Sequence, residues 1–339
     1  MRGVRMLRVA AAVAFIWLVA PAGARASSPC HEWAFTSPSR SVFHAVHIPV
    51  RLPTTSVAGY DADVLRPVKA PKGVRLPGVV LLHGRGGTKC GLWWAARLLA
   101  GRGYETLVLT YPSSGTPAQV EPGGASAARA ALAWLRSSSN PYRPELRAND
   151  LALMGHSLGA IVAQDVQQDA SLPYIKTIVA LDNLRKYLIG DPGGAVSCDP
   201  STLAGPITPR VPALGLGSLT GCPPPDQAIT DKSTGYKNWR AAGVFVEEAV
   251  LAHSNHNGYA DGPPFDAAHR AQLRHAAYYV LAWLARWLRG DTTQEARLVS
   301  QTPFGIPVTA MLADDASAPA FTSSAFLPSK ECPVLRACP

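Results

Sequence analysis

Short runs of apolar residues alternate along the chain with longer segments in which apolar residues recur every three or four positions. The first pattern is typical of strands buried on both faces, and the second of helices that cover a sheet. The alternation predicts an α/β fold with a mostly parallel central sheet and helices on both faces. Expected strands lie at residues 79–82, 106–111, 150–154, 176–181, 211–217 and 244–251. Expected helices lie at residues 92–100, 124–136, 158–164, 236–242 and 266–288.

Two further segments, residues 42–50 and 58–65, are expected to form an antiparallel lead-in to this sheet. Hydrophobic residues make up 47% of the chain and no internal repeat is present. Such a composition is ample for one large core. We therefore expect one globular domain over residues 27–290, followed by a tail over residues 291–339 to which the sequence assigns no role.

The N-terminal segment has the pattern of a secretory signal peptide. Arg2, Arg5 and Arg8 precede an apolar run over residues 9–20, and small residues stand at positions 24 and 26. The run is shorter than the roughly 18 residues that a membrane span needs. We expect a signal peptide over residues 1–26, a secreted (extracellular or periplasmic) mature protein and no stable membrane insertion. The alternative is a short hydrophobic anchor that is never cleaved.

Removal of that segment changes the charge of the chain. Without the four arginines of residues 1–26, the 32 basic residues become 28 against 23 acidic residues, a net charge of +5. This mild surplus is spread along the chain without a basic cluster, so it does not indicate nucleic-acid binding.

Six cysteines lie beyond the expected signal peptide, and their even number permits complete pairing in an oxidising compartment. No C-x-x-C pair or Cys/His cluster has the spacing of a structural zinc site, so disulfide bonds are the better interpretation. On sequence proximity we favour two pairs, with the remaining two cysteines forming a third: Cys198 with Cys222, Cys332 with Cys338, and Cys30 with Cys90.

The sequence Gly155-His156-Ser157-Leu158-Gly159 stands where an expected strand turns into an expected helix. A G-x-S-x-G turn in this setting holds a serine on a strained backbone position above the sheet, with the following amide free to face an oxyanion. The glycines are needed because a side chain on either flank would collide with the neighbouring strand or helix. Ser157 is therefore the candidate nucleophile.

Ligands of a parallel sheet bind beyond the carboxyl ends of its strands. The first such end is followed by residues 83–87, with the sequence HGRGG. We expect the amides of Arg85 and Leu158 to be the two oxyanion donors. Trp93 and Trp94 follow shortly afterwards and are candidates for the lining of an apolar acyl pocket, although tryptophans that open a helix are as often core packing.

A serine nucleophile needs a base, and the loop after the last expected strand carries His253 and His256. An imidazole on this loop can reach Ser157, take its proton and return it to the leaving group. We select His256 as the base, with His253 as the alternative.

Two carboxylates compete as the acid that orients the base. In the commonest arrangement the acid follows the strand expected at residues 211–217, where the first carboxylate is Asp226. The strand at residues 176–181, however, ends directly in Asp182, which is thereby held at the rim where a triad assembles. We select Asp182 over Asp226.

The sequence over residues 78–287 resembles the α/β-hydrolase superfamily in its candidate nucleophile, oxyanion, acid and base motifs. Within that superfamily it is most similar to the plasma-type platelet-activating factor acetylhydrolases and to the dienelactone-hydrolase and polyester-hydrolase group. The matching motifs are HGRG at residues 83–86, GHSLG at 155–159, ALD at 180–182 and HNGYAD at 256–261. The resemblance implies the α/β-hydrolase fold and a triad in the order Ser, Asp, His. Acetylhydrolase relatives place the acid after the earlier strand, which supports Asp182. Arg85 departs from the family, in which many members have an apolar or aromatic residue there.

The segment over residues 184–225 is rich in Gly and Pro, and we expect it to form a short flap rather than a large cap domain. An open cleft of this kind suits a small-molecule, lipid or polyester ester as substrate.

The sequence thus predicts a secreted serine esterase or lipase that works through an acyl-enzyme, with no metal and no cofactor. Two other classes stay open: an acyltransferase with the same triad, and a catalytically inactive secreted binding protein on a hydrolase scaffold. The motifs do not define the oligomeric state.

Overall fold

The fold is described from a computed structural model of the chain. It describes residues 30, 41–48, 60–68, 72–114, 117–182, 184–185, 187–189, 203–220, 229–262 and 265–298. The expected signal peptide, Asp226 and the tail beyond residue 298 lie outside the described residues.

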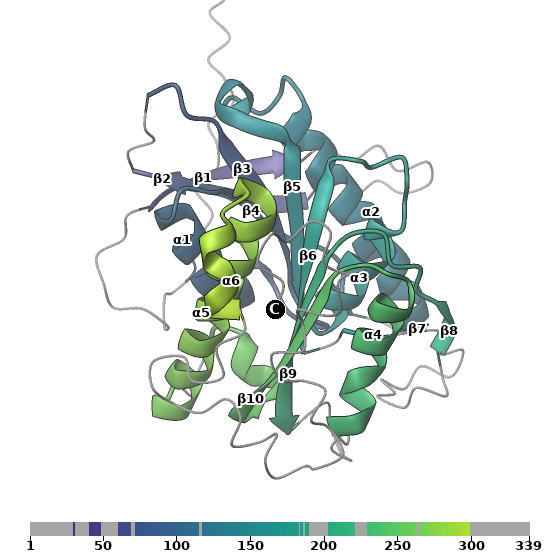
Figure 1. The fold of residues 1–339 in the computed structure, drawn as a ribbon. Helices are drawn as coiled ribbons and strands as arrows, with labels where there is room; N and C mark the ends of the chain where they lie inside the picture. Colours follow the sequence, from purple (N-terminus) through teal and green to yellow (C-terminus); the bar gives the residue numbers. More distant parts are fainter. Residues whose placement is uncertain are drawn as a thin grey trace, which may run out of the picture.

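The centre of the molecule is an eight-stranded sheet in the order β1-β2-β4-β3-β5-β6-β9-β10 (Figure 1). The expected lead-in is confirmed, because β1 pairs with β2 and β2 with β4 in antiparallel fashion, whereas all other neighbours are parallel. The strands are β1 (Ser41–Ile48), β2 (Tyr60–Pro67), β3 (Leu76–Leu82), β4 (Glu105–Thr110), β5 (Leu146–His156), β6 (Ile175–Leu181), β9 (Ala213–Thr220) and β10 (Val246–Asn255).

Helices cover both faces of the sheet (Figure 1). Helices α1 and α5 contribute to one hydrophobic cluster, and α2, α3 and α4 contribute to a second cluster on the opposite face. The helices are α1 (Trp93–Gly101), α2 (Pro117–Arg136), α3 (Leu158–Gln167), α4 (Ile229–Ala241) and α5 (Ala267–Arg289). The expected α/β architecture with a mostly parallel sheet is therefore confirmed.

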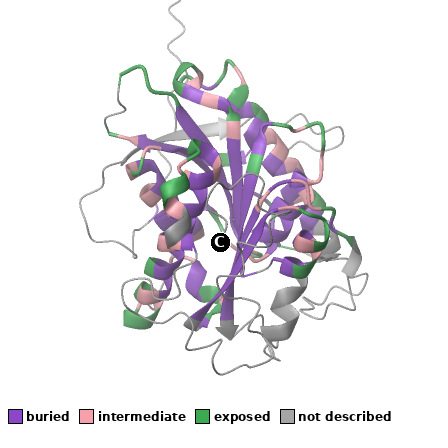
Figure 2. Cartoon of the chain, viewed as in Figure 1, coloured by how far each residue is buried: buried purple, intermediate pink, exposed green. Residues whose placement is uncertain are grey.

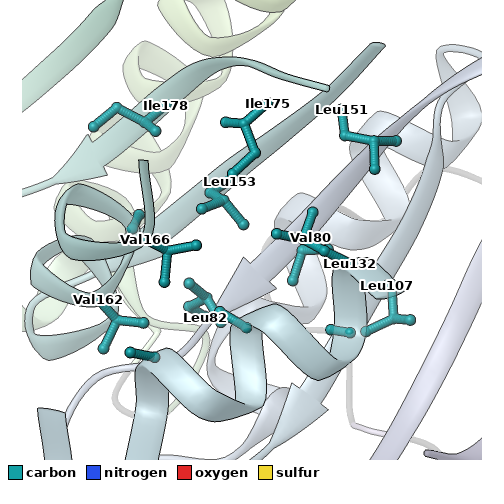
Figure 3. Close-up of a cluster of buried hydrophobic side chains, with 14 of the residues drawn as sticks. Val80, Leu82, Leu107, Leu132, Leu151, Leu153, Val162, Val166, Ile175 and Ile178 are labelled. Atoms are coloured by element: carbon teal, nitrogen blue, oxygen red, sulfur yellow. The ribbon is translucent and has the colours of Figure 1, made fainter. Parts of the chain in front are cut away.

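The two clusters explain why the strands are apolar without alternation. Val79 and Leu81 of β3 face the α1 and α5 side, whereas Val80 and Leu82 face the α2 and α3 side. Figure 2 shows the central strands buried along most of their length, with exposed residues near the beginnings of β5 and β6. Figure 3 shows the second cluster, in which Val80 and Leu82 lie among side chains of neighbouring strands and helices. A strand buried on both faces needs an apolar residue at every position.

A short hairpin of β7 (Tyr187–Ile189) and β8 (Leu203–Pro206) was not expected from the sequence. It lies within the segment for which a flap was predicted. No large cap domain is present in the described part of the chain.

The folded unit also continues beyond the predicted boundary at residue 290. The short helices η5 (Thr292–Gln294) and α6 (Glu295–Leu298) follow α5, and Leu298 belongs to the α1 and α5 cluster. Among the described helices, none is both long and apolar enough to cross a membrane.

A disulfide bond joins Cys30 to Cys90, as the sequence predicted. Cys90 lies in the 3-10 helix η1 (Lys89–Leu92), between the first strand-end loop and α1. The adjacent Lys89 is buried and its Nζ lies 2.9 Å from Asp63 Oδ2 on β2. Covalent and ionic links therefore anchor this turn at neighbouring positions. The other four cysteines lie outside the described residues.

Candidate active site

Ser157 stands at the turn between β5 and α3 with φ 53° and ψ −118°. A positive φ is unfavourable for a residue with a side chain and persists only where the surroundings impose it. Here the Ser157 amide donates to the Leu181 carbonyl at 3.0 Å, and the Ser157 carbonyl accepts from Ala160 and Ile161 at the start of α3. The turn is thus fixed from both sides with its serine between strand and helix.

The glycines of the turn are required by close backbone approach. A Cβ atom built on Gly155 would lie within 3.0 Å of the Gly159 backbone. A Cβ atom on Gly159 would lie within 3.0 Å of the Leu82 carbonyl on β3. Real Cβ atoms do not approach backbone so closely, so α3 can begin this near the sheet only with glycine at both positions.

The structure brings Ser157, Asp182 and His256 together from three separate loops. The Ser157 hydroxyl donates to His256 Nε2 at 2.9 Å, and His256 Nδ1 donates to Asp182 Oδ2 at 2.7 Å. The Asp182 side chain is 3% exposed and the His256 side chain is 12% exposed. An ionised carboxylate can only accept, so the Nδ1 atom carries the proton and Nε2 is free to act as a base.

Asp182 is held at the end of β6 by the neighbouring strand β9. Its own φ is 55°, and its amide donates to the Leu216 carbonyl at 2.8 Å. The Ser218 amide donates to Asp182 Oδ1 at 2.7 Å, and the Ser218 hydroxyl donates to Asp182 Oδ2 at 2.5 Å. Ser218 was not singled out by the sequence analysis. Asp226, the alternative acid, lies outside the described residues.

His256 opens the 3-10 helix η4 (His256–Tyr259), which is clamped to α5. The Asn255 side chain accepts from the Gly258 amide at 2.8 Å. Gln272 of α5 accepts from the Asn255 amide at 3.1 Å and donates to its carbonyl at 2.9 Å. The backbone that carries His256 is therefore fixed by hydrogen bonds on both sides of the residue. The alternative base, His253, lies within β10, and its side chain is outside the described part of the chain.

His156, directly before the candidate nucleophile, connects the Gly155–Gly159 turn (the nucleophile elbow) to the loop that carries His256. Its Nε2 donates to the His256 carbonyl at 2.8 Å, and its ring lies 4.9 Å from the His256 ring. Burial, followed by the nearby His256, lowers the pKa of His156 to about 3. The ring is therefore neutral at ordinary pH, and this interaction adds no charge beside the base.

The loop after β3 is braced by His83 and Tyr111. The Tyr111 amide donates to His83 Nε2 at 3.2 Å, and the Tyr111 hydroxyl donates to the His83 carbonyl at 2.5 Å. Because Nε2 accepts, Nδ1 carries the proton and donates to the Gly84 carbonyl at 2.7 Å. The two rings also stack at 4.1 Å. Burial lowers the pKa of His83, which keeps it neutral in this structural role.

The two predicted oxyanion donors, Arg85 and Leu158, belong to the loop after β3 and to the start of α3. In the loop after β3, the Gly86 amide donates to Ser113 and the Gly87 amide donates to Gly84, both at 3.1 Å. Arg85 is exposed and lies inside the turn that the Gly87–Gly84 bond closes. Leu158 is the first residue of α3, and because the first amides of a helix have no acceptor within the helix, its amide is a candidate donor to an oxyanion.

Trp93 and Trp94 do not line an open pocket, which corrects one expectation from the sequence. Their exposed fractions are 2% and 0%, and both belong to the α1 and α5 cluster. The Trp94 indole donates to the Tyr259 carbonyl at 2.9 Å. A side chain with no exposed surface offers none to a substrate, so these tryptophans pack the core, and Trp94 supports the end of η4.

The described ranges contain no group of three or more His, Cys, Asp or Glu residues that could hold a metal ion. The site combines a hydroxyl, an imidazole, a carboxylate and backbone amides, which are the groups that nucleophilic catalysis by a serine requires.

A family model described as the alpha/beta hydrolase family matches residues 79–337. No curated protein matches the chain.

Proposed function

Because the chain belongs to the alpha/beta hydrolase family, we propose that it is a secreted serine hydrolase that cleaves carboxylic esters through an acyl-enzyme intermediate. The observation that carries the proposal is the pair of hydrogen bonds that joins Ser157 to His256 and His256 to Asp182. This order of hydroxyl, imidazole and carboxylate is the arrangement that activates a serine for acyl transfer.

In the first half-reaction the Ser157 oxygen attacks the ester carbonyl while His256 Nε2 takes the hydroxyl proton. The Asp182 carboxylate stabilises the imidazolium that forms. Collapse of the tetrahedral intermediate breaks the ester C–O bond, and His256 returns the proton to the departing alcohol. In the second half-reaction a water molecule is deprotonated in the same way, and the carboxylic acid and free Ser157 are released.

The negative charge of the tetrahedral intermediate needs donors that are already in place. We assign this role to the amides of Arg85 and Leu158. The Leu158 amide also benefits from the positive end of the α3 dipole. Because both donors are backbone groups on braced turns, little reorganisation is needed when the charge develops.

Several features support an ester as substrate. The described part of the chain has no large cap domain, which favours an open cleft that accepts a bulky ester. The motif resemblance to acetylhydrolases and polyester hydrolases gives the narrower substrate classes, a lipid ester or a polyester.

The proposal also places the protein outside the cytoplasm. The Cys30–Cys90 bond supports this location, because structural disulfides persist chiefly in oxidising compartments. N-terminal sequencing of the exported protein tests it. We expect a mature terminus near Ser27, and a retained Met1 on exported protein would contradict cleavage.

A panel of p-nitrophenyl esters from acetate to palmitate tests the activity. We expect turnover of at least one chain length by the wild type and none above background by Ser157→Ala. Equal turnover by both proteins would contradict the proposal. A parallel reaction with an acceptor alcohol separates the two acyl-transfer classes, since a hydrolase releases the acid and an acyltransferase forms a new ester.

A further inference from the structure

Ser218 lies on β9, the strand beside β6 in the sheet. The two strands are parallel, and Leu181 at the end of β6 is level with Leu216. Asp182 follows directly after β6, and Ser218 lies two positions beyond Leu216 on β9. The carboxyl ends of the two strands therefore place the carboxylate of one beside the hydroxyl of the other.

Both hydrogen-bond donors of Ser218, its backbone amide and its hydroxyl, contact this carboxylate. The amide donates to Oδ1 at 2.7 Å and the hydroxyl donates to Oδ2 at 2.5 Å. The same Oδ2 atom accepts from His256 Nδ1 at 2.7 Å. Ser218 is 0% exposed, so water does not compete for these bonds.

We propose that Ser218 is a positioning residue that sets the orientation of the Asp182 carboxylate toward His256. This inference rests on the proposed function. The torsion that turns a carboxylate about its Cβ–Cγ bond is soft and has no sharp minimum. One donor on each oxygen fixes the carboxylate plane, and the hydroxyl draws Oδ2 into line with the imidazole.

The place of Ser218 in the fold strengthens the inference. The end of β9 is where the commonest triad arrangement carries the acid itself. Here the acid comes from β6, and β9 supplies its donor from the adjacent position. The carboxyl ends of β6 and β9 thus together position one carboxylate.

Two substitutions of equal size isolate the hydroxyl. Ser218→Thr keeps the oxygen and adds a methyl group, and Ser218→Val has the same volume without the oxygen. Both are well suited to a strand. We expect kcat for an ester substrate to stay within about threefold of wild type in S218T and to fall by about 10- to 100-fold in S218V, with KM changed less than twofold in both. A loss of packing alone would affect the two variants equally.

Ser218→Ala is the second test, because it removes only the hydroxyl oxygen and keeps the backbone amide. We expect the same selective fall in kcat, and circular dichroism checks that each variant is folded. If S218V does not fold, S218A carries the comparison with S218T. Activity of S218A equal to that of wild type, or equal kcat in folded S218T and S218V, would overturn the inference.

The same assay includes Ser157→Ala, so that two failures can be told apart. If Ser157→Ala keeps its activity, the proposed function fails. If Ser157→Ala is inactive while S218A and S218V match wild type, the triad stands and only the positioning role of Ser218 is lost.

Discussion

Asp182 Oδ2 lies 2.7 Å from His256 Nδ1, although 74 residues separate the two in sequence. The contact exists because β6 and β10 lie on either side of β9, so that the loops at their carboxyl ends meet above it. This contact favours an acid at the end of β6, Asp182, over Asp226, which follows β9 in sequence and lies outside the described residues.

Asp182→Asn should lower kcat steeply while leaving the fold nearly unchanged. An asparagine in this position can favour the wrong imidazole tautomer, and a loss on the order of 10⁴-fold accompanies this change in a well-studied protease. Asp226→Asn is the matched control and should cost little. Both variants are assayed on one substrate, with circular dichroism as a folding check. An inactive Asp226→Asn beside an active Asp182→Asn would move the acid to the later loop.

Gly159→Ala should disrupt the elbow. The added Cβ would lie within 3.0 Å of the Leu82 carbonyl, so the start of α3 must move away from β3. We expect the free energy of unfolding to fall by about 1–3 kcal/mol, with loss of ester hydrolysis. Urea unfolding measures the first effect and the ester assay the second.

Gly123→Ala is the control for this change, because Gly123 also lies in a helix, α2, and no described atom comes within 4 Å of a Cβ built there. Alanine at this position should stabilise the protein by about 0.5–1 kcal/mol. A Gly159→Ala protein that is as stable and active as Gly123→Ala would refute the close-packing explanation.

His156→Gln should make the stability less dependent on acid pH. The pKa of His156 is about 3 in the folded protein, against 6.5 for an ordinary histidine. Between these values the unfolded chain binds a proton that the folded chain does not, so this group's contribution to stability is present above pH 6.5 and is lost as pH falls toward 3. Glutamine does not titrate and can still donate to the His256 carbonyl.

The free energy of unfolding of the wild type should therefore fall, relative to that of His156→Gln, by about 1.4 kcal/mol for each pH unit within this window. Urea unfolding at pH 4, 5 and 6 gives the difference between the two proteins. All other titrating groups are shared, so parallel curves would show that the folded protein protonates His156 as readily as the unfolded chain.

Loss of the Cys30–Cys90 bond should destabilise the protein without abolishing the triad. The bond spans 60 residues, and the loop-closure model assigns about 4 kcal/mol to a link of that length. Cys30→Ser with Cys90→Ser should lower the melting temperature, whereas kcat of the folded variant should stay close to wild type. An unchanged melting temperature would mean that the ion pair of Lys89 with Asp63 is sufficient to hold η1.

The disulfide pairs Cys198–Cys222 and Cys332–Cys338 remain predictions. Peptide mapping under non-reducing conditions tests them.

The sheet could be predicted because a strand buried on both faces has an apolar residue at nearly every position, as residues 79–82 do. The β7–β8 hairpin could not, because a strand of three residues gives no periodic signal. Helix α2 begins at Pro117, seven residues earlier than expected. Its first turns could not be predicted because Pro122 lies within them, and a proline inside a segment usually argues against a helix.

The elbow could be identified because its residues are adjacent in sequence, and His256 could be placed because it follows the last strand. Ser218 could not be identified from the sequence, because its contact with Asp182 arises only when β9 pairs with β6 in the sheet. The tryptophans were misassigned for a similar reason. Trp94 closely follows the loop after β3 in sequence, but in the fold its ring is buried in the core and its indole N–H donates to the Tyr259 carbonyl.

Covalent labelling tests the central claim, that Ser157 is a nucleophile activated by His256, most directly. The full-length protein is treated with a fluorophosphonate, digested and mapped by mass spectrometry, with His256→Ala in parallel. We expect the adduct on Ser157 and on no other serine, and a labelling rate in His256→Ala at least about 100-fold lower, since general-base assistance contributes on the order of 10²–10⁴. An adduct on a different serine, or equal labelling rates in the two proteins, would contradict the account.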